Sequence, residues 1–269
     1  MDSGRKISVM GILNLTDDSF YAGSRIGTAD TARAVRKAEE MVAEGADILD
    51  FGACSTRPGS IPVDPGTEWK RLSPALRAVR DAFPGIRISV DTFRSEVVRR
   101  VHDLIGDFLV NDISAGEDDP AMLETVGELS LSYVAMHKRG TPATMDSLAL
   151  YEDVTAEVLR YLQEFAAKAE RAGITDWIAD PGFGFAKTVP QNYELLRNLP
   201  SFGVLGKPVL VGISRKSMIY KPLGITPEEA LPATSALHLE ALRGGASILR
   251  VHDVAAAVQV VGLYRLLNP

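Results

Sequence analysis

Ile86-Arg87-Ile88-Ser89-Val90-Asp91 is a short stretch typical of a buried strand, and it ends in a carboxylate. Seven further short apolar runs also lead into polar residues, ending before Asn14, Ser55, Asn111, His137, Asp180, Ser214 and Arg250. Strands of a parallel sheet covered on both faces are apolar throughout rather than alternating. Polar residues at the C-terminal end of every strand are typical of a (β/α)8 barrel, whose active site lies at that end. The pattern therefore predicts an α/β fold, a single (β/α)8 TIM barrel.

Helical segments lie between the predicted strands, and most are bounded by residues that start or stop helices. We expect helices over residues 28–44, 65–82, 95–104, 119–129, 153–172, 191–199, 227–243 and 254–267. Several of these segments run into glycine, such as Gly45 and Gly173, which is the commonest residue after a helix. Strand and helix alternate without a low-complexity tract or linker, so we expect one domain over residues 1–269.

Composition and charge restrict the class of protein. The chain has 269 residues, 46% of them hydrophobic, which is enough for one large core, since a barrel typically takes about 250 residues. A net charge of -6 argues against nucleic acid or an anionic membrane as partner. Cys54 is the one cysteine, which excludes an internal disulfide. The first residues lead straight into the first predicted strand, and no apolar run could span a bilayer, so we expect a cytoplasmic protein.

Four strand-end side chains suit a flat heterocycle. Asp91 and Asp180 provide carboxylates, and Asn111 adds an amide. Carboxylate oxygens match the N–H groups of an aminopyrimidine edge, and Lys216 suits the carbonyl side of such a ring. We therefore expect these side chains to bind one ring together.

A second group of strand-end residues suits an anion. Asn14 follows the first predicted strand, and Arg250 and His252 alternate along the last one. The first and last strands are neighbours in a closed barrel, so these side chains predict an anion or metal–anion pocket. Residues 212–217 also enter a short helix, where free N–H groups favour anions.

Five motifs occur in order along the chain: Gly11-Ile12-Leu13-Asn14-Leu15-Thr16, Asp18-Ser19-Phe20, Ser55-Thr56-Arg57-Pro58-Gly59, Asp180-Pro181-Gly182-Phe183-Gly184-Phe185 and Ser214-Arg215-Lys216. They resemble the signatures of the dihydropteroate synthase family. The resemblance covers essentially the whole chain, and the ordered set is specific where no single motif would be. It implies a folate-pathway transferase on a (β/α)8 barrel, which joins 7,8-dihydropterin-6-ylmethyl diphosphate to 4-aminobenzoate, releases diphosphate and uses Mg²⁺. It also implies a homodimer.

The resemblance assigns the site residue by residue. It places the pterin on Asp91, Asn111, Asp180 and Lys216, the same four side chains selected above by donor and acceptor chemistry. It places the diphosphate on Asn14, Thr56, Arg250 and His252, with Asn14 also the Mg²⁺ ligand. It places 4-aminobenzoate and its closing loops on Asp18, Phe20, Thr56, Arg57, Pro58, Phe185 and Ser214. The expected mechanism is dissociative substitution, in which the enzyme positions the substrates and stabilises charge. Competition by sulfonamides with 4-aminobenzoate is expected.

Other polar residues have simpler interpretations. We expect Asp112 to be a structural partner and Arg215 to point away from the site and pair with an acid behind its loop. Lys187 lies in a glycine- and alanine-containing stretch and is expected to be a solvated charge. His137 is left out of the site as a buried hydrogen-bonding residue, and Cys54 is expected to pack as a small side chain.

Departures from the family pattern lie mainly in the loops. Asp17 stands where proline is usual, Cys54 where an acid is common and Ala186 where glycine is usual.

Proteins with two other functions have the same pterin-type barrel. A methyltetrahydrofolate-binding methyltransferase domain would need no diphosphate contacts. A non-catalytic pterin-binding homologue would be expected to lose Asn14, Arg57, Lys216 or His252, and all four are present.

Overall fold

Eight parallel strands form one sheet in the order β6-β5-β4-β3-β2-β1-β8-β7. The computed structural model describes residues 6–15, 31–54, 63–141 and 144–269. The strands are β1 Ser8–Asn14, β2 Ile48–Gly52, β3 Arg87–Asp91, β4 Leu109–Asp112, β5 Ser132–Met136, β6 Trp177–Asp180, β7 Leu210–Val211 and β8 Ile248–Val251. A parallel bridge joins Ala179 of β6 to Val209, just before β7, and brings the two edges of the sheet together. The predicted (β/α)8 barrel is confirmed.

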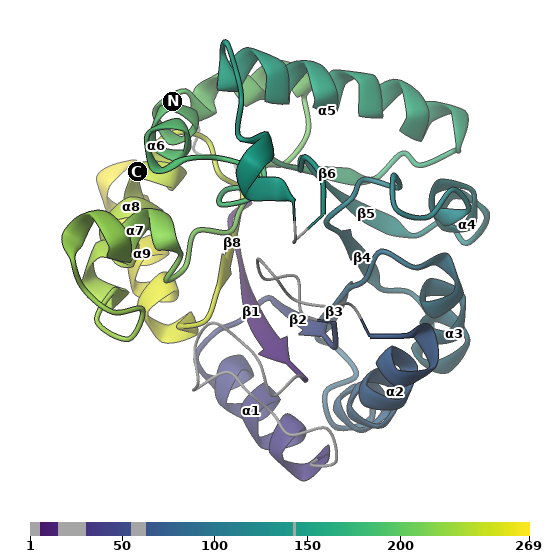
Figure 1. Ribbon diagram of the computed structural model, residues 1–269. Helices are drawn as coiled ribbons and strands as arrows, with labels where there is room; N and C mark the ends of the chain where they lie inside the picture. The colour runs from purple at the N-terminus through teal and green to yellow at the C-terminus, as the bar shows by residue number, and fades with distance from the viewer. Residues whose placement is uncertain (1–5, 16–30, 55–62, 142–143) are drawn as a thin grey trace.

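Helices surround this ring of strands (Figure 1). They are α1 Thr31–Ala43, α2 Pro65–Ala82, α3 Ser95–Ile105, α4 Met122–Glu128, α5 Val154–Arg171, α6 Val189–Arg197, α7 Ser217–Leu223, α8 Leu231–Arg243 and α9 Val254–Leu267. Two 3-10 segments, η2 Met145–Leu148 and η3 Leu199–Leu205, were not expected from the sequence. The expected bounds differ most at α4 and α8, which both begin later in the chain than the sequence pattern indicated. Within the described ranges, no helix has the length and apolarity needed to cross a membrane.

Side-chain caps fix where several helices begin. Asp64 accepts a hydrogen bond from the backbone N–H of Thr67 at 3.0 Å, with Pro65 in the first helical position of α2. Thr188 and Gln191 form a reciprocal capping box at the start of α6. Such caps satisfy N–H groups that have no partner within the helix. The starts of α2 and α6 are thereby fixed just after the loops that follow β2 and β6.

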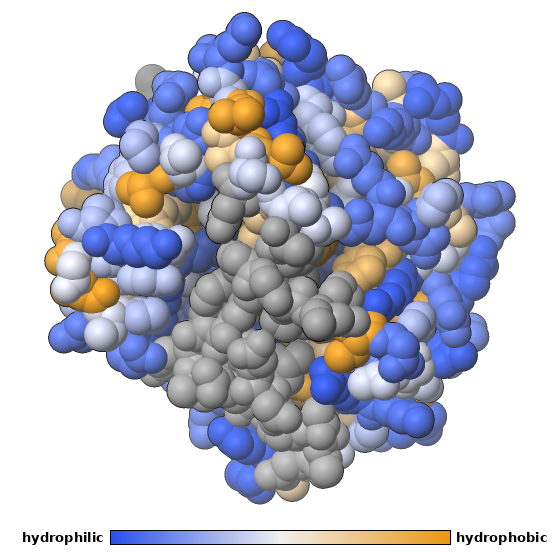
Figure 2. Space-filling model, viewed as in Figure 1, coloured by the Kyte–Doolittle hydropathy of each residue, from blue (hydrophilic) through white to orange (hydrophobic). Residues whose placement is uncertain are grey.

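The strands pack between two apolar clusters, one on each face of the sheet. Outward-facing strand residues pack against the helices in a large buried cluster. A separate buried cluster lies on the inner faces of the strands and consists of Met10, Ile48, Leu109, Val134, Ile178, Leu210 and Ile248. These residues alternate along the strands with those that contact the helices, as the two faces of a strand require. Polar side chains dominate the visible surface of the surrounding helices (Figure 2).

Candidate active site

The strand register brings three sequence-predicted positions into one row with Gly52. Asn14 lies opposite Gly52, Gly52 opposite Asp91, and Asp91 opposite Asn111. A methyl group at Gly52 would lie 3.3 Å from Oδ1 of Asn14 and 3.9 Å from Oδ2 of Asp91, so glycine leaves room for both side chains. The carboxyl ends of β1 to β4 therefore present an amide, a gap, a carboxylate and a second amide side by side.

Asp50 lies at the centre of the buried polar network below this row, and the sequence interpretation missed it. Its carboxylate is fully buried and accepts hydrogen bonds from Ser89 Oγ at 2.6 Å and Asn111 Nδ2 at 3.2 Å. Arg250 contacts the same carboxylate through Nε at 2.7 Å and Nη2 at 2.6 Å. The signal available in the sequence was a charged residue inside the apolar run Ile48-Leu49-Asp50-Phe51, because carboxylates are almost never fully buried unless paired.

Arg250 bridges Asp50 and Asp91. Its Nη2 lies 2.9 Å from Oδ2 of Asp91, so one guanidinium group contacts both carboxylates. Burial raises the pKa of Asp91 to about 7, opposed by Arg250 and assisted by the charge of Asp50. Asp91 is therefore a carboxyl group that changes charge near neutral pH.

Asp180 at the end of β6 and Lys216 in the segment that follows β7 carry opposite charges that act on each other. Asp180 accepts a hydrogen bond from the backbone N–H of Gly182 at 2.8 Å, and burial raises its pKa against the opposing influence of Lys216 and Arg250. Lys216 donates to the carbonyl of Phe183 at 2.6 Å. Its Nζ lies 4.8 Å from the ring centroid of Phe185, within the range of a cation–π contact. Burial lowers the pKa of Lys216 to about 8.

His252 and Ser214 meet beside this pair. Oγ of Ser214 lies 3.0 Å from Nδ1 of His252 and accepts the backbone N–H of the same histidine at 3.2 Å. Burial, with Arg250 adding to it, lowers the pKa of His252 to about 3, so the imidazole is neutral at physiological pH. His252 therefore offers a hydrogen bond rather than a positive charge.

Arg215 points away from the site, as expected, and pairs with Asp253. Its Nε and Nη2 each lie 2.8 Å from a different oxygen of that carboxylate. Asp112 is structural, also as expected, since it accepts hydrogen bonds from Ser114, Gly116 and the hydroxyl of Tyr133. Neither charged group is directed at the reacting end of the barrel.

Lys187 contradicts its expected role as a solvated charge. Its side chain is buried, and its Nζ donates to the carbonyls of Gly182 and Phe185 at 2.9 and 3.0 Å. It also lies 3.0 Å from Nδ1 of His137. Ala186, just before it, has φ 49°, in the region where a residue other than glycine is strained.

The residues predicted for the first and second loops lie outside the described residues. These are Asp18, Phe20, Thr56, Arg57 and Pro58. Val63 is the first described residue after the second loop. Arg94 donates to its carbonyl and pairs with the buried carboxylate of Glu68. Cys54 is buried, as expected, and burial raises the pKa of its thiol, which disfavours the reactive thiolate.

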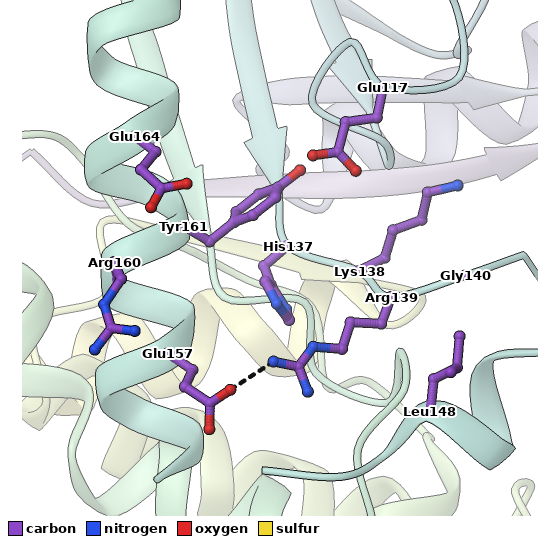
Figure 3. Close-up of a pocket in the computed structure, with 10 residues that line it drawn as sticks. All are labelled: Glu117, His137, Lys138, Arg139, Gly140, Leu148, Glu157, Arg160, Tyr161 and Glu164. Atoms are coloured by element: carbon purple, nitrogen blue, oxygen red, sulfur yellow. Dashed lines mark hydrogen bonds and ion pairs between the residues drawn. The ribbon is translucent and has the colours of Figure 1, made fainter. Parts of the chain in front are cut away.

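A cavity of about 530 Å³ opens on the helix side of β5. His137 and Tyr161 lie in it between α5 and the segment that carries Arg139, whose guanidinium pairs with Glu157 at 2.6 Å (Figure 3). Both cationic and anionic side chains line this cavity, so it favours neither an anionic nor a cationic ligand. The predicted strand-end residues instead gather inside the mouth of the barrel.

The barrel mouth combines three chemical functions. Buried carboxylates and Asn111 can bind the donor edge of a heterocycle, and Lys216 can donate to its carbonyl. Arg250 and the imidazole of His252 can contact an anion. This set of hydrogen-bond donors and acceptors suits a heterocycle that is linked to a phosphate group.

The pterin-binding enzyme family model matches residues 10–252 of the chain. The chain belongs to this family. The dihydropteroate synthase of Escherichia coli (strain K12) is 42% identical over 256 residues, covering 94% of this chain and 89% of that protein. The expected family, and with it the class of transferase, is confirmed.

Solved structures of the family share this fold over nearly the whole chain. The dihydropteroate synthase of Yersinia pestis, in complex with a sulfonamide drug, superposes with a TM-score of 0.91 at 33% identity and covers 99% of this chain and 95% of that one. The Xanthomonas albilineans enzyme with 4-aminobenzoic acid has a TM-score of 0.88 at 39% identity, with 97% and 93% covered.

Proposed function

We propose that the protein condenses 7,8-dihydropterin-6-ylmethyl diphosphate with 4-aminobenzoate, giving 7,8-dihydropteroate and diphosphate. The observation that carries this proposal is the gathering of the buried Asn111 and Asp180 and the partly buried Asp91 and Lys216 at one barrel mouth. The 4-aminobenzoic acid bound by the Xanthomonas albilineans relative supports the second substrate.

The pterin is held by charge and hydrogen bonding. Asp180 and Asp91, when ionised, accept from the N–H groups of the aminopyrimidine edge, and Lys216 donates to the ring carbonyl. Lys216 donates to the carbonyl of Phe183 at 2.6 Å, and the charges of Asp180 and Asp91 act on its ammonium group, which supports this role. Buried carboxylate charge also stabilises a cation that develops on the pterin when the leaving group departs.

The leaving diphosphate faces the ends of β1 and β8. Arg250 supplies positive charge from its position between Asp50 and Asp91. His252 supplies a neutral hydrogen-bond donor, because its pKa is lowered to about 3. The C–O bond to diphosphate breaks, the amine nitrogen of 4-aminobenzoate bonds to the same carbon, and the amine proton passes to solvent. No activated serine or cysteine is needed, since the substrate itself is the nucleophile.

Asn14 fits the expected role in Mg²⁺ binding. Mg²⁺ commonly takes one or two protein oxygens and completes its shell with water and substrate phosphates. The amide oxygen of Asn14 lies at the barrel mouth, over the space left by Gly52. The described ranges contain no cluster of three His, Cys, Asp or Glu residues suited to a metal, so substrate oxygens would complete the site. When bound there, Mg²⁺ would neutralise charge on the leaving diphosphate.

The proposal is tested by incubating purified protein with the pterin diphosphate, 4-aminobenzoate and Mg²⁺. Dihydropteroate and diphosphate should appear in equal amounts. Pterin binding without turnover would instead favour the non-catalytic homologue. Absence of both would refute the assignment of the pterin pocket.

Asp180→Asn provides a direct test of the charge at the end of β6. The amide keeps the shape of the side chain but removes its negative charge, and we expect kcat to fall by about 10²-fold or more. Glu164→Gln on the exposed face of α5 removes one negative charge away from the strand ends and should leave kcat unchanged. Equal effects of the two substitutions would contradict the role of Asp180.

Inhibition by sulfonamides provides a second test of the aminobenzoate pocket. The sulfonamide complex of the Yersinia pestis relative supports competition with 4-aminobenzoate at this site. Raising the 4-aminobenzoate concentration should restore the rate. A cytoplasmic homodimer stays a prediction, and light scattering would measure the assembly.

A further inference from the structure

Lys187 is a buried ammonium group directly behind the candidate site. It lies in the loop between β6 and α6, and its side chain is 9% exposed. The carbonyls of Gly182 and Phe185 and Nδ1 of His137 all lie within 3.0 Å of its Nζ. A protonated lysine has three donors and no acceptor, so these three neighbours match its hydrogen-bonding capacity.

A lysine in this place carries a desolvation cost. Two of its three hydrogen-bond partners are backbone carbonyls, and the third is a neutral imidazole, because burial lowers the pKa of His137 to about 2. Burial lowers the pKa of Lys187 itself to about 7, although the charge of Asp180 opposes this change. Taking an ammonium group out of water destabilises the folded state unless charges and hydrogen bonds compensate for it. An apolar side chain would avoid that cost but would leave the three acceptors without this donor.

The loop that Lys187 holds carries contacts to both charged site residues. The N–H of Gly182 donates to Asp180, and the carbonyl of Phe183 accepts from Lys216. The ring of Phe185 lies beside the ammonium group of Lys216. The two carbonyls bound by Lys187 belong to the first and last residues of this same turn, which a hydrogen bond from Phe185 N to Gly182 O closes.

His137 connects this turn to β5. Its ring packs edge-on against Tyr161 of α5, with centroids 4.9 Å apart and an interplanar angle of 88°. A methyl group on Gly182 would lie 1.9 Å from the carbonyl oxygen of His137, so the turn is in direct contact with the strand end. Lys187 therefore joins the turn to a side chain that is itself fixed by packing.

We propose that Lys187 is a positioning residue for the reaction, which fixes the turn 182–185 against His137 and thereby orients Asp180 and Lys216. It touches neither substrate in this role. The inference rests on the proposed function, because its effect is measured on that reaction.

The test compares Lys187→Met with Lys207→Met in the full-length protein. Lys207 also donates to a backbone carbonyl, that of Thr175 at 2.9 Å, but lies at the opposite end of the barrel. We expect Lys187→Met to lower kcat/KM by about 10- to 100-fold, the scale of a small misplacement of reacting groups. Its midpoint of thermal unfolding is measured in parallel, so that any loss of folded protein is separated from the loss of kcat/KM. Lys207→Met should leave kcat/KM unchanged.

A pH profile separates positioning from simple structural support. Asp180 is faced by the N–H of Gly182 and by the charges of Lys216, Arg250 and Lys187, and each of these lowers its pKa. Removing Lys187 should therefore raise the pKa of Asp180 and move the acid limb of kcat/KM to higher pH. The inference is overturned if Lys187→Met loses activity only in proportion to its loss of folded protein. It is also overturned if the kcat/KM of the variant stays within about two-fold of that of the unsubstituted enzyme.

Lys187→Ala provides a second variant if the methionine variant does not fold. Alanine leaves out the last three methylenes and the ammonium group, which n-propylammonium can replace. Saturable recovery of activity with n-propylammonium, but not with 1-propanol, supports the proposal, and no recovery refutes it. The unsubstituted enzyme is assayed in parallel. Failure of its turnover refutes the proposed function, whereas normal turnover with an unaffected variant refutes the role of Lys187 alone.

Discussion

Asp50→Asn should change the pH dependence of pterin binding through Asp91. Oxygens of Asp50 and Asp91 lie 2.6 and 2.9 Å from the same Nη2 of Arg250. They are therefore at most about 5.5 Å apart, the sum of the two distances. Two negative charges at that separation repel by about 3 kcal/mol at an effective dielectric constant of about 20.

That repulsion helps to hold the pKa of Asp91 at about 7. Asparagine at position 50 removes it and leaves Arg250 to Asp91 alone, so the pKa of Asp91 should fall. The energy corresponds to about two pH units. Pterin binding requires ionised Asp91, so the acid limb of binding should move from near pH 7 to near pH 5.

Calorimetric titration with 6-hydroxymethylpterin at pH 6 and pH 8 measures the affinity at each pH. This ligand has no phosphate group whose own protonation would change between the two pH values. The unsubstituted protein should bind about ten-fold more weakly at pH 6, because about nine-tenths of Asp91 is then protonated. The Asp50→Asn variant should bind nearly equally at both values. Ser89→Ala is the control, since it removes the neutral hydrogen bond to Asp50 and no charge. A ten-fold difference retained by folded Asp50→Asn would refute the reasoning.

Three further substitutions test the loops that carry the site. Gly182→Ala should lower the free energy of unfolding by about 2–4 kcal/mol, because glycine has φ +73° there and a methyl group would meet the carbonyl of His137. Ala186→Gly should raise it by up to about 1 kcal/mol by relieving a left-handed alanine. Arg215→Leu should lower it by about 3 kcal/mol, because Asp253 loses a buried bidentate partner. Denaturant unfolding measures all three.

Two matched variants check these expectations. Gly85→Ala adds a methyl group where no atom lies within 4 Å and should change the unfolding free energy little. Arg99→Leu breaks a surface pair with Glu128, whose side chains are both about half exposed, and should cost less than about 1 kcal/mol. If Gly182→Ala or Arg215→Leu is no more destabilising than its matched variant, the packing explanation fails.

Local pattern was sufficient to predict the barrel. Each strand had to be apolar because it is covered on both faces, and each helix had to alternate with a strand to cover the sheet. Glycines and capping residues then placed most helix ends within a few residues. The later start of α8 is an exception, since residues 227–230 form a turn before it, closed by a hydrogen bond from Ala230 N to Pro227 O.

The same pattern identified strand-end residues, but not their electrostatic state. His252 was expected at the anion pocket, yet its charge depends first on burial, which the folded barrel provides, and then on Arg250. Lys187 was expected in solvent because its local sequence contains small residues. Its burial is decided by His137, which comes from another strand 50 residues earlier.

The sequence by itself determined the fold and the family, because strand periodicity and motif order are properties of the chain. Only the tertiary structure decided that Asp50 faces inward and holds Arg250, a contact between residues 200 positions apart. Closure of the barrel brings such residues together and removes them from water. The pKa of a buried group then depends on charges supplied by distant strands, which no local pattern contains.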